Sequence, residues 1–167
     1  MKRATMGQTR TVIDMKQILG AGVICGMRTL SGPAFLAAYA QKHERQIPDG
    51  SLLRWLAAPP VPFLLKAMAS GELAGDKLLR IPARVEPAPL LARLFSGALV
   101  GAGLSTLQKR SPLGGALLGG AAAVGAAFAA YHTRRALTEE KGLPDSLVAV
   151  AEDALVLGLG FDVFEVE

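Results

Sequence analysis

Apolar and small residues dominate five stretches of the 167-residue chain, and short polar or charged stretches separate them. The five stretches are residues 17–41, 52–76, 90–107, 112–131 and 146–161. A helix needs about 20 apolar residues to cross the roughly 30 Å hydrocarbon layer of a membrane. The pattern therefore predicts an all-α, polytopic transmembrane bundle of four to five helices. The bundle occupies residues 17–167 and follows a basic cytoplasmic segment at residues 1–16.

Prolines divide two of these stretches. In the first stretch, Pro33 removes a backbone donor and predicts a break in the helix nearby. Three prolines and the charges of Lys66, Glu72 and Asp76 weaken the stretch 52–76, which we interpret as an interfacial piece around Trp55 followed by a helix from Pro62. Whether this stretch crosses fully or is re-entrant stays open. The residues at 78–89 and at 132–145 are expected to be loops.

Glycine pairs at four-residue spacing recur along the chain, and alanine fills many of the neighbouring positions. The pairs are Gly22 and Gly26, Gly71 and Gly75, Gly97 and Gly101, and Gly115 and Gly119. In lipid, small residues let helix backbones approach closely, and van der Waals contact then holds the helices together. The pairs predict tight crossings within the monomer, and a homodimer contact through residues 90–107 or 112–131 is the alternative.

The composition supports a membrane location and excludes several function classes. Hydrophobic residues make up 51% of the chain, charged residues 19% and aromatic residues 5%, which excludes a disordered chain. The net charge is +4, but the basic residues form no patch with aromatic residues, so nucleic-acid binding is not expected. The single Cys25 cannot form an internal disulfide and is expected to be structural.

The distribution of Lys and Arg predicts an orientation. Five crossings with the N-terminus inside give the cytoplasmic segments twice as many basic residues as the outer ones. The inner set is Lys2, Arg3, Arg10, Lys16, Lys77, Arg80, Arg84, Arg134, Arg135 and Lys141, and the outer set is Lys42, Arg45, Arg54, Lys109 and Arg110. This orientation also places the C-terminus outside.

Enzyme signatures are missing from the sequence. His43 and His132 lie in or beside polar stretches without metal-ligand spacing. No serine lies in a Gly-x-Ser-x-Gly turn, and no glycine run has the form of a phosphate-binding loop. We therefore expect no enzymatic activity, no metal and no cofactor.

We single out five of the charged residues that lie within or at the ends of the apolar stretches, where a charge costs several kcal/mol unless it is paired or hydrated. They are Arg28, Glu72, Asp76, Glu152 and Asp153. One interpretation pairs Arg28 with one or more of the acids to stabilise the bundle. A second makes the cluster an ion or substrate site beside the broken helix, supported by Ser31, Lys77 and Arg84. A third places the acids at the water boundary.

Two parts of the chain share an order of features: an apolar stretch rich in small residues, and then a helix with two acids. The first runs from residues 17–41 to Glu72 and Asp76, and the second from residues 112–131 to Glu152 and Asp153. This order suggests an inverted repeat, an architecture that many transporters use.

Four ordered motifs resemble a known family. They are Gly26-Met27-Arg28-Thr29-Leu30-Ser31-Gly32-Pro33-Ala34, then Gly71-Glu72-Leu73-Ala74-Gly75-Asp76-Lys77-Leu78 leading to Ile81-Pro82-Ala83-Arg84, then Leu91-Ala92-Arg93-Leu94-Phe95-Ser96-Gly97-Ala98, and finally Ala151-Glu152-Asp153-Ala154-Leu155. Across residues 18–160 the chain resembles the bacterial domain-of-unknown-function family 4126. The resemblance implies a small integral membrane protein of bacteria and carries no established activity.

Two functional hypotheses follow. The first is a small transporter or channel for an ion or solute in the bacterial inner membrane, with Glu72 and Glu152 as cation or proton sites. Asp76 and Asp153 would support these sites, and Arg28 would be the counter-charge. The second is a non-transporting structural or accessory subunit. Both imply the lipid bilayer as a partner, with a homo-oligomer or a membrane-complex partner as an addition. A water-accessible crevice at Glu72 or Glu152 favours transport, whereas acids saturated by Arg28 and backbone groups favour the structural role.

Overall fold

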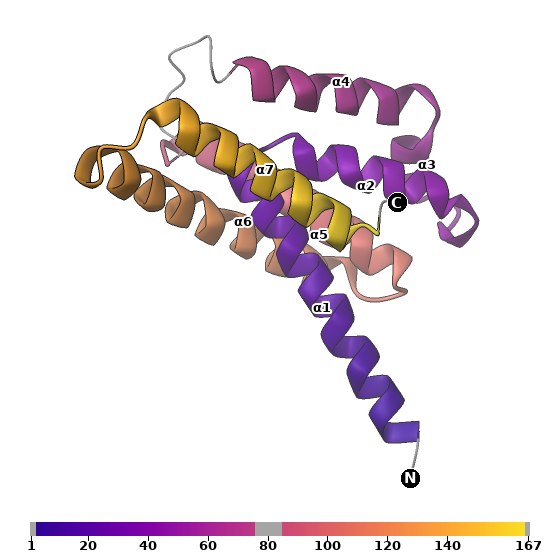
Figure 1. Ribbon diagram of the computed structural model, residues 1–167. Coiled ribbons are helices and arrows are strands. Elements are labelled where there is room, and N and C mark those ends of the chain that lie inside the picture. The colour runs from indigo at the N-terminus through magenta and orange to yellow at the C-terminus, as the bar shows by residue number, and fades with distance from the viewer. Residues whose placement is uncertain (1–2, 76–84, 166–167) are drawn as a thin grey trace.

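The computed structural model describes residues 3–75 and 85–165, with side chains described at residues 15–72 and 85–165. All regular structure in this part of the chain is helical (Figure 1), as the sequence predicts. The helices are α1 (Arg3–Met27), α2 (Ser31–Lys42), α3 (Leu52–Ala57), α4 (Pro60–Gly75), α5 (Pro87–Leu107), α6 (Pro112–Arg135) and α7 (Asp145–Val163), with a 3-10 turn at Glu44–Gln46 and a π-helical turn at Ala136–Glu140.

A three-residue break separates α1 from α2. The last helical bond of α1 runs from the Arg28 N–H to the carbonyl of Ile24, at 2.8 Å. Pro33 is the third residue of α2, and the first turn of a helix is where a missing N–H costs no helical bond. The break predicted near Pro33 is confirmed, and it lies at residues 28–30, just before the proline's helix.

The two helices fold back on each other, so their outer ends lie at the same end of the bundle. Near the start of the apolar part of α1, the Gln17 amide donates to the carbonyl of Val163 at 2.7 Å and accepts from Gln108 at 2.9 Å. Near the end of α2, the rings of Tyr39 and Phe164 lie 5.9 Å apart. The structure therefore differs from the single crossing expected of this first apolar stretch, because the break lets α2 return.

Glycines allow α1, α5 and α6 to cross at backbone contact. A Cβ added at Gly101 would lie 2.1 Å from the carbonyl oxygen of Gly115, and one added at Gly119 would lie 2.3 Å from that of Gly97. A Cβ at Gly22 of α1 would lie 2.6 Å from the carbonyl oxygen of Gly119. The tight crossings predicted within the monomer are confirmed for these glycines, which are therefore not available for a homodimer contact.

Two alanine substitutions on α6 test this packing. Gly119→Ala is expected to lower the free energy of unfolding by about 1–3 kcal/mol, since the new methyl group overlaps the α5 backbone. Gly125→Ala is the matched control, because no atom of another element lies within 4 Å of a Cβ there. Alanine is the better helix former, so Gly125→Ala should leave stability unchanged or raise it by up to about 1 kcal/mol. Chemical unfolding in detergent measures both, and equal losses would contradict the crossing.

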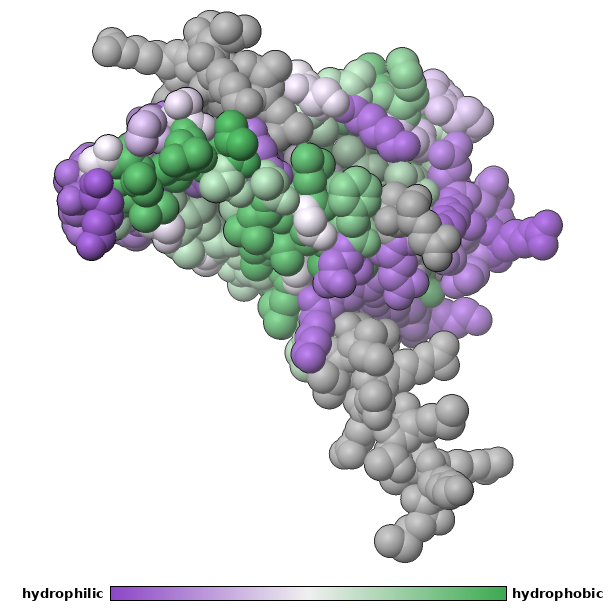
Figure 2. All heavy atoms as spheres, in the orientation of Figure 1, coloured by the Kyte–Doolittle hydropathy of each residue, from purple (hydrophilic) through white to green (hydrophobic). Residues whose placement is uncertain are grey.

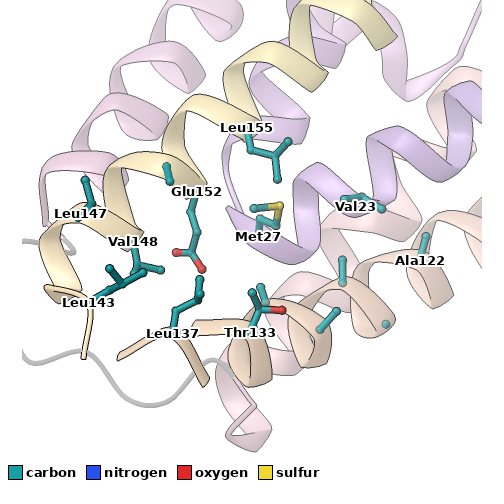
Figure 3. Close-up of a pocket in the computed structure, with 15 residues that line it drawn as sticks. Val23, Met27, Ala122, Thr133, Leu137, Leu143, Leu147, Val148, Glu152 and Leu155 are labelled. Carbon is teal, nitrogen blue, oxygen red and sulfur yellow. The ribbon is translucent and has the colours of Figure 1, made fainter. Parts of the chain in front are cut away.

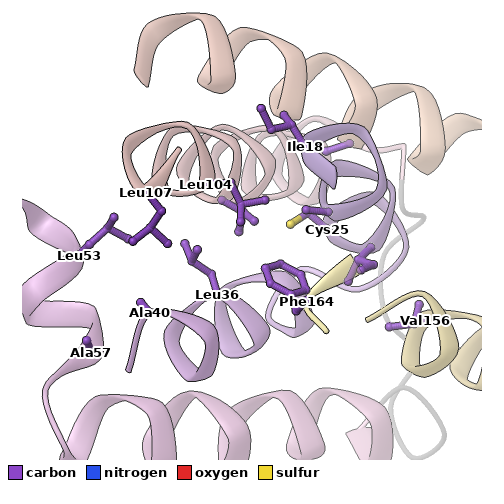
Figure 4. Close-up of a cluster of buried hydrophobic side chains, with 14 of the residues drawn as sticks. Ile18, Cys25, Leu36, Ala40, Leu53, Ala57, Leu104, Leu107, Val156 and Phe164 are labelled. Atoms are coloured by element: carbon purple, nitrogen blue, oxygen red, sulfur yellow. The ribbon is translucent and has the colours of Figure 1, made fainter. Parts of the chain in front are cut away.

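The hydrophobic core lies between α1, α2, α5 and the end of α7. Cys25, Leu36, Leu104 and Phe164 are fully buried in one cluster (Figure 4). The ring of Phe35 on α2 stacks on Phe164, with ring centroids 5.7 Å apart. The cluster thus holds the returning helix α2 against α5 and α7, and Cys25 is part of the packing, as expected of a structural thiol.

Charged residues after α6 continue a helix instead of forming the expected loop at 132–145. α6 reaches Arg135 and the π-helical turn extends to Glu140. The Arg135 guanidinium binds the Glu139 carboxylate at 2.7 Å across one helical turn, which stabilises the helical form. The loop prediction is therefore wrong over residues 132–140, because charge alone does not end a helix.

Prolines begin helices where the sequence predicted loops or later starts. α4 starts at Pro60, two residues before the predicted Pro62, and α5 starts at Pro87, within the predicted loop at 78–89. Proline suits the first helical position, because its N–H would have no helical partner there. Most of the remaining predicted loop lies outside the described residues.

By length and composition, two helical stretches of the described chain can cross a membrane: Pro87–Leu107 and Pro112–Glu140. Met15–Met27 is a shorter apolar helix. These are fewer spans than the four to five predicted. Figure 2 shows an apolar band over α7 between polar surfaces at the two ends of the long helices. The exposed apolar side chains of α7 are Leu147, Val150, Leu155, Leu157 and Phe161.

Candidate functional site: a charged junction at the break between α1 and α2

A carboxylate from α4 satisfies the backbone N–H groups at the break. A helix start leaves its first N–H groups without helical partners. The two oxygens of Glu72 accept from the N–H groups of Thr29 and Leu30, each at 2.8 Å. The carboxylate also lies at the start of α2, where the helix dipole favours negative charge. Glu72 therefore caps α2 from a different helix, with both of its oxygens used as acceptors.

Side chains from α5 satisfy the carbonyl groups on the other side of the break. Arg93 Nε donates to the Gly26 carbonyl at 2.9 Å, and Ser96 Oγ donates to the Thr29 carbonyl at 2.5 Å. Arg93 is buried in α5. A cation at the C-terminal end of α1 also meets the favourable end of that helix dipole. At the break, the acid Glu72 thus binds backbone N–H groups, and the base Arg93 binds a backbone carbonyl at the end of α1.

A buried ion pair joins the break to α7. Arg28 donates to Asp153 Oδ1 through Nε at 3.0 Å and Nη2 at 2.5 Å. Arg28 is 1% exposed. A desolvated arginine at this position requires a carboxylate partner, since an unpaired buried charge is strongly unfavourable. The expected pairing of Arg28 with an acid is confirmed, and the partner is Asp153.

The neighbouring acid, Glu152, points to a different place. Its carboxylate accepts from Arg134 Nη1 at 3.3 Å, at the end of α6. Arg134 also binds Asp145 through two parallel bonds, Nε to Oδ1 at 2.8 Å and Nη2 to Oδ2 at 2.6 Å. Consecutive helix residues project about 100° apart. The two adjacent acids therefore belong to two separate charge clusters.

The structure brings together part of the set of residues singled out from sequence. Arg28, Glu72 and Asp153 meet at the junction, and the buried Ser31 begins α2 beside it. Glu152 lies in the second cluster. Asp76, Lys77 and Arg84 lie outside the described residues.

Sequence reasoning missed two members of the junction, Arg93 and Ser96. A signal was present, because Arg93 is the single charge in the apolar stretch 90–107 and belongs to the third of the four motifs. It also missed that Arg134 would bind both Glu152 and Asp145. Arg134 and Asp145 lie in the polar stretch 132–145, where charged residues are expected to be solvated and give no sign of a specific partner.

The family described as Domain of unknown function (DUF4126) matches residues 15–165 of the chain. The chain belongs to this family. The DUF4126 match includes α1 from residue 15 onward, all of α2 and every residue of the junction, and it ends just after α7. No curated protein and no solved structure matches the chain.

The charged side chains of the DUF4126 junction form hydrogen bonds with one another and with the backbone groups at the break. Its carboxylates accept from backbone N–H groups or from a guanidinium, and its cations donate to carbonyls or to a carboxylate. Within the described part of the chain, no three His, Cys, Asp or Glu side chains are grouped so that they could hold a metal ion. These hydrogen bonds and the ion pair connect the break between α1 and α2 to α4, α5 and α7.

Proposed function

We infer that the protein is a polytopic membrane protein in which α4, α5, α6 and α7 cross the bilayer and α1 and α2 form a re-entrant pair. The support comes from large exposed apolar side chains, which the hydrocarbon of a bilayer would cover. Phe63 of α4 is 76% exposed, Phe95 of α5 is 69% exposed, and Leu113 and Leu117 of α6 are 69% and 67% exposed. Soluble proteins rarely expose so many large apolar side chains together.

The order of the helices supports a crossing by α4. α2 ends near Phe164, and α5 ends next to Gln17 at that same end of the bundle. α5 is about 32 Å long, so it starts at the opposite end. The chain must therefore change ends between α2 and α5, and α4 is the long helix between them. This assignment makes the stretch 52–77 a crossing rather than a re-entrant segment.

In this arrangement the N-terminal and C-terminal ends of the bundle share one side, which we assign to the cytoplasm of a bacterium. Basic residues favour that side, as the positive-inside rule requires. Among the residues whose side chains are described, it carries Lys16, Lys42, Arg45, Arg54, Lys109 and Arg110, against Arg134, Arg135 and Lys141 at the other end. This arrangement keeps the cytoplasmic N-terminus that we expect from sequence. It places the C-terminus in the cytoplasm as well, whereas the sequence prediction places it outside.

For the activity, the junction supports a non-transporting structural or accessory subunit of a membrane complex. One observation carries this proposal: each oxygen of Glu72, one of the two acids that the transport hypothesis uses, accepts a hydrogen bond from a backbone N–H group. The other acid, Glu152, lines a groove between α6 and α7, but Thr133 is the one other polar residue of that lining, so the groove offers no polar path for an ion. A proton or cation site needs a carboxylate that can exchange partners. Releasing Glu72 would leave the two N–H groups without acceptors, at a cost of about 1–3 kcal/mol each.

Liposome flux tests the proposal. We expect the wild-type protein, reconstituted in liposomes, to give proton and cation flux no greater than that of protein-free liposomes. The Glu72→Gln variant should give the same flux as wild type. Wild-type flux above the protein-free level that Glu72→Gln abolishes, while the variant keeps the wild-type elution volume in detergent, would support a transporter and overturn the structural assignment.

A further inference from the structure

An apolar groove opens between α6 and α7, with the end of α1 along one side. Its volume is about 740 Å³, within the range of sites that hold small molecules. The α6 side is built of small residues such as Ala122, Ala126 and Ala129, and the α7 side of larger residues such as Leu147 and Leu155. The groove can therefore receive a long, narrow apolar group.

The polar groups of this groove lie in the half nearer the turn between α6 and α7, where Leu137, Leu143, Leu147 and Val148 also line it. Thr133 and Glu152 are the polar residues among those that line it, and both lie toward the turn between α6 and α7 (Figure 3). The Glu152 side chain is 11% exposed and is directed into the groove, and its carboxylate forms an ion pair with Arg134 Nη1 at 3.3 Å. Arg135 also lies near this end of α6. The groove is thus apolar over most of its length, and the negative Glu152 and the positive Arg134 and Arg135 lie near the end at the turn.

The length of the groove matches one leaflet of a bilayer. From its far end at Ala122 to the polar Thr133, the lining along α6 is about 17 Å long at 1.5 Å per residue, and it continues to Leu137 in the π-helical turn. Half of the roughly 30 Å hydrocarbon core is about 15 Å. The charged end coincides with the polar turn between α6 and α7, which our membrane arrangement places at the water boundary. The groove is therefore oriented like a lipid in the adjoining leaflet.

We propose that this groove binds one phospholipid whose headgroup carries a primary ammonium, as in phosphatidylethanolamine. An acyl chain lies along α6, the ammonium donates to the Glu152 carboxylate, and the phosphate faces the arginines at the end of α6. A quaternary choline has no N–H to donate, and an anionic glycerol headgroup has no cation for Glu152, so both are bound more weakly. The proposal rests on the membrane location inferred above.

Lipid binding to the purified, delipidated protein in detergent measures this preference. Phosphatidylethanolamine, phosphatidylcholine and phosphatidylglycerol with identical acyl chains are titrated separately and followed by native mass spectrometry. We expect phosphatidylethanolamine to bind roughly tenfold more tightly than the other two, as one charge-assisted hydrogen bond in a partly buried site allows.

Three variants locate the binding site. Glu152→Gln should remove the preference for phosphatidylethanolamine, whereas Asp162→Asn, which changes another acid of the same helix outside the groove, should keep it. Gly125→Leu fills the groove at a position where a Cβ meets no neighbour, and it should weaken all three lipids together. Since Gly125 is remote from the charged end, this variant also tests the site if Glu152→Gln does not fold.

Equal affinity of the wild type for the three lipids would overturn the proposal. A preference for phosphatidylethanolamine that Glu152→Gln retains would also overturn it, and so would lipid affinities that Gly125→Leu leaves unchanged. A dimer that Gly125→Leu dissociates would identify a second copy of the chain as the occupant of the groove and would also overturn it. None of these results bears on the liposome flux, so the two proposals fail independently.

Discussion

Arg28→Met should lower the free energy of unfolding by about 3–5 kcal/mol, the largest effect expected of a single substitution in this protein. Methionine fills a similar volume but leaves the Asp153 carboxylate without the guanidinium that binds it through two nitrogens. The pair is almost fully buried, with side-chain exposures of 2% and 13%. The loss therefore includes the cost of a carboxylate that is left largely buried without its guanidinium partner. Chemical unfolding in detergent measures it.

Two further variants separate this buried pair from ordinary charge removal. The double variant Arg28→Met/Asp153→Leu should recover most of the stability, because replacing both members of a buried pair is far less costly than removing one. Arg54→Met is the surface control, since Arg54 and Asp49 form an ion pair at 2.6 Å that is largely exposed and should contribute little. A loss for Arg28→Met no greater than that for Arg54→Met would contradict the structural role of the pair.

Removing the Glu72 carboxylate should open the break between α1 and α2. Glu72→Ala leaves the N–H groups of Thr29 and Leu30 without the acceptors that they have at 2.8 Å. The expected cost is about 1–3 kcal/mol for each N–H group. Glu72→Gln keeps one acceptor oxygen and should lose about half as much.

Hydrogen exchange reports this effect where it occurs. In Glu72→Ala the amides of Thr29 and Leu30 should exchange roughly ten to a hundred times faster than in wild type, as the energies above imply. The amide of Val100, in the core of α5, should not change. Unchanged exchange at Thr29 and Leu30 would show that Glu72 does not cap α2.

The helices could be predicted from sequence because their cause is local. Apolar stretches, small residues and a proline near position 33 predict five regions of helix and one break, and the structure contains them. The prolines at the helix starts were interpreted less well, since a proline disfavours a helix interior and favours its first turn. Pro60 and Pro87 therefore begin helices earlier than expected.

The return of α2 and the partners of the charges could not be predicted, because they depend on distant residues. A broken helix can continue or turn back, and contacts between Tyr39 and Phe164 at the end of α7 accompany the turn. Glu152 and Asp153 are adjacent in sequence, yet one meets Arg134 and the other Arg28. The suggested inverted repeat stays a prediction.

The central claim is that α1 and α2 form a re-entrant pair, closed by the charged junction, in a four-crossing bundle. Cysteines introduced singly at Lys16, Gln46 and Lys141 test it with a membrane-impermeant maleimide applied to either side of oriented vesicles. All three positions are exposed, whereas the native Cys25 is fully buried and gives little background. We predict that positions 16 and 46 react from the same side and position 141 from the other. Reaction of 16 and 141 from one side and of 46 from the other would contradict the claim and restore five crossings.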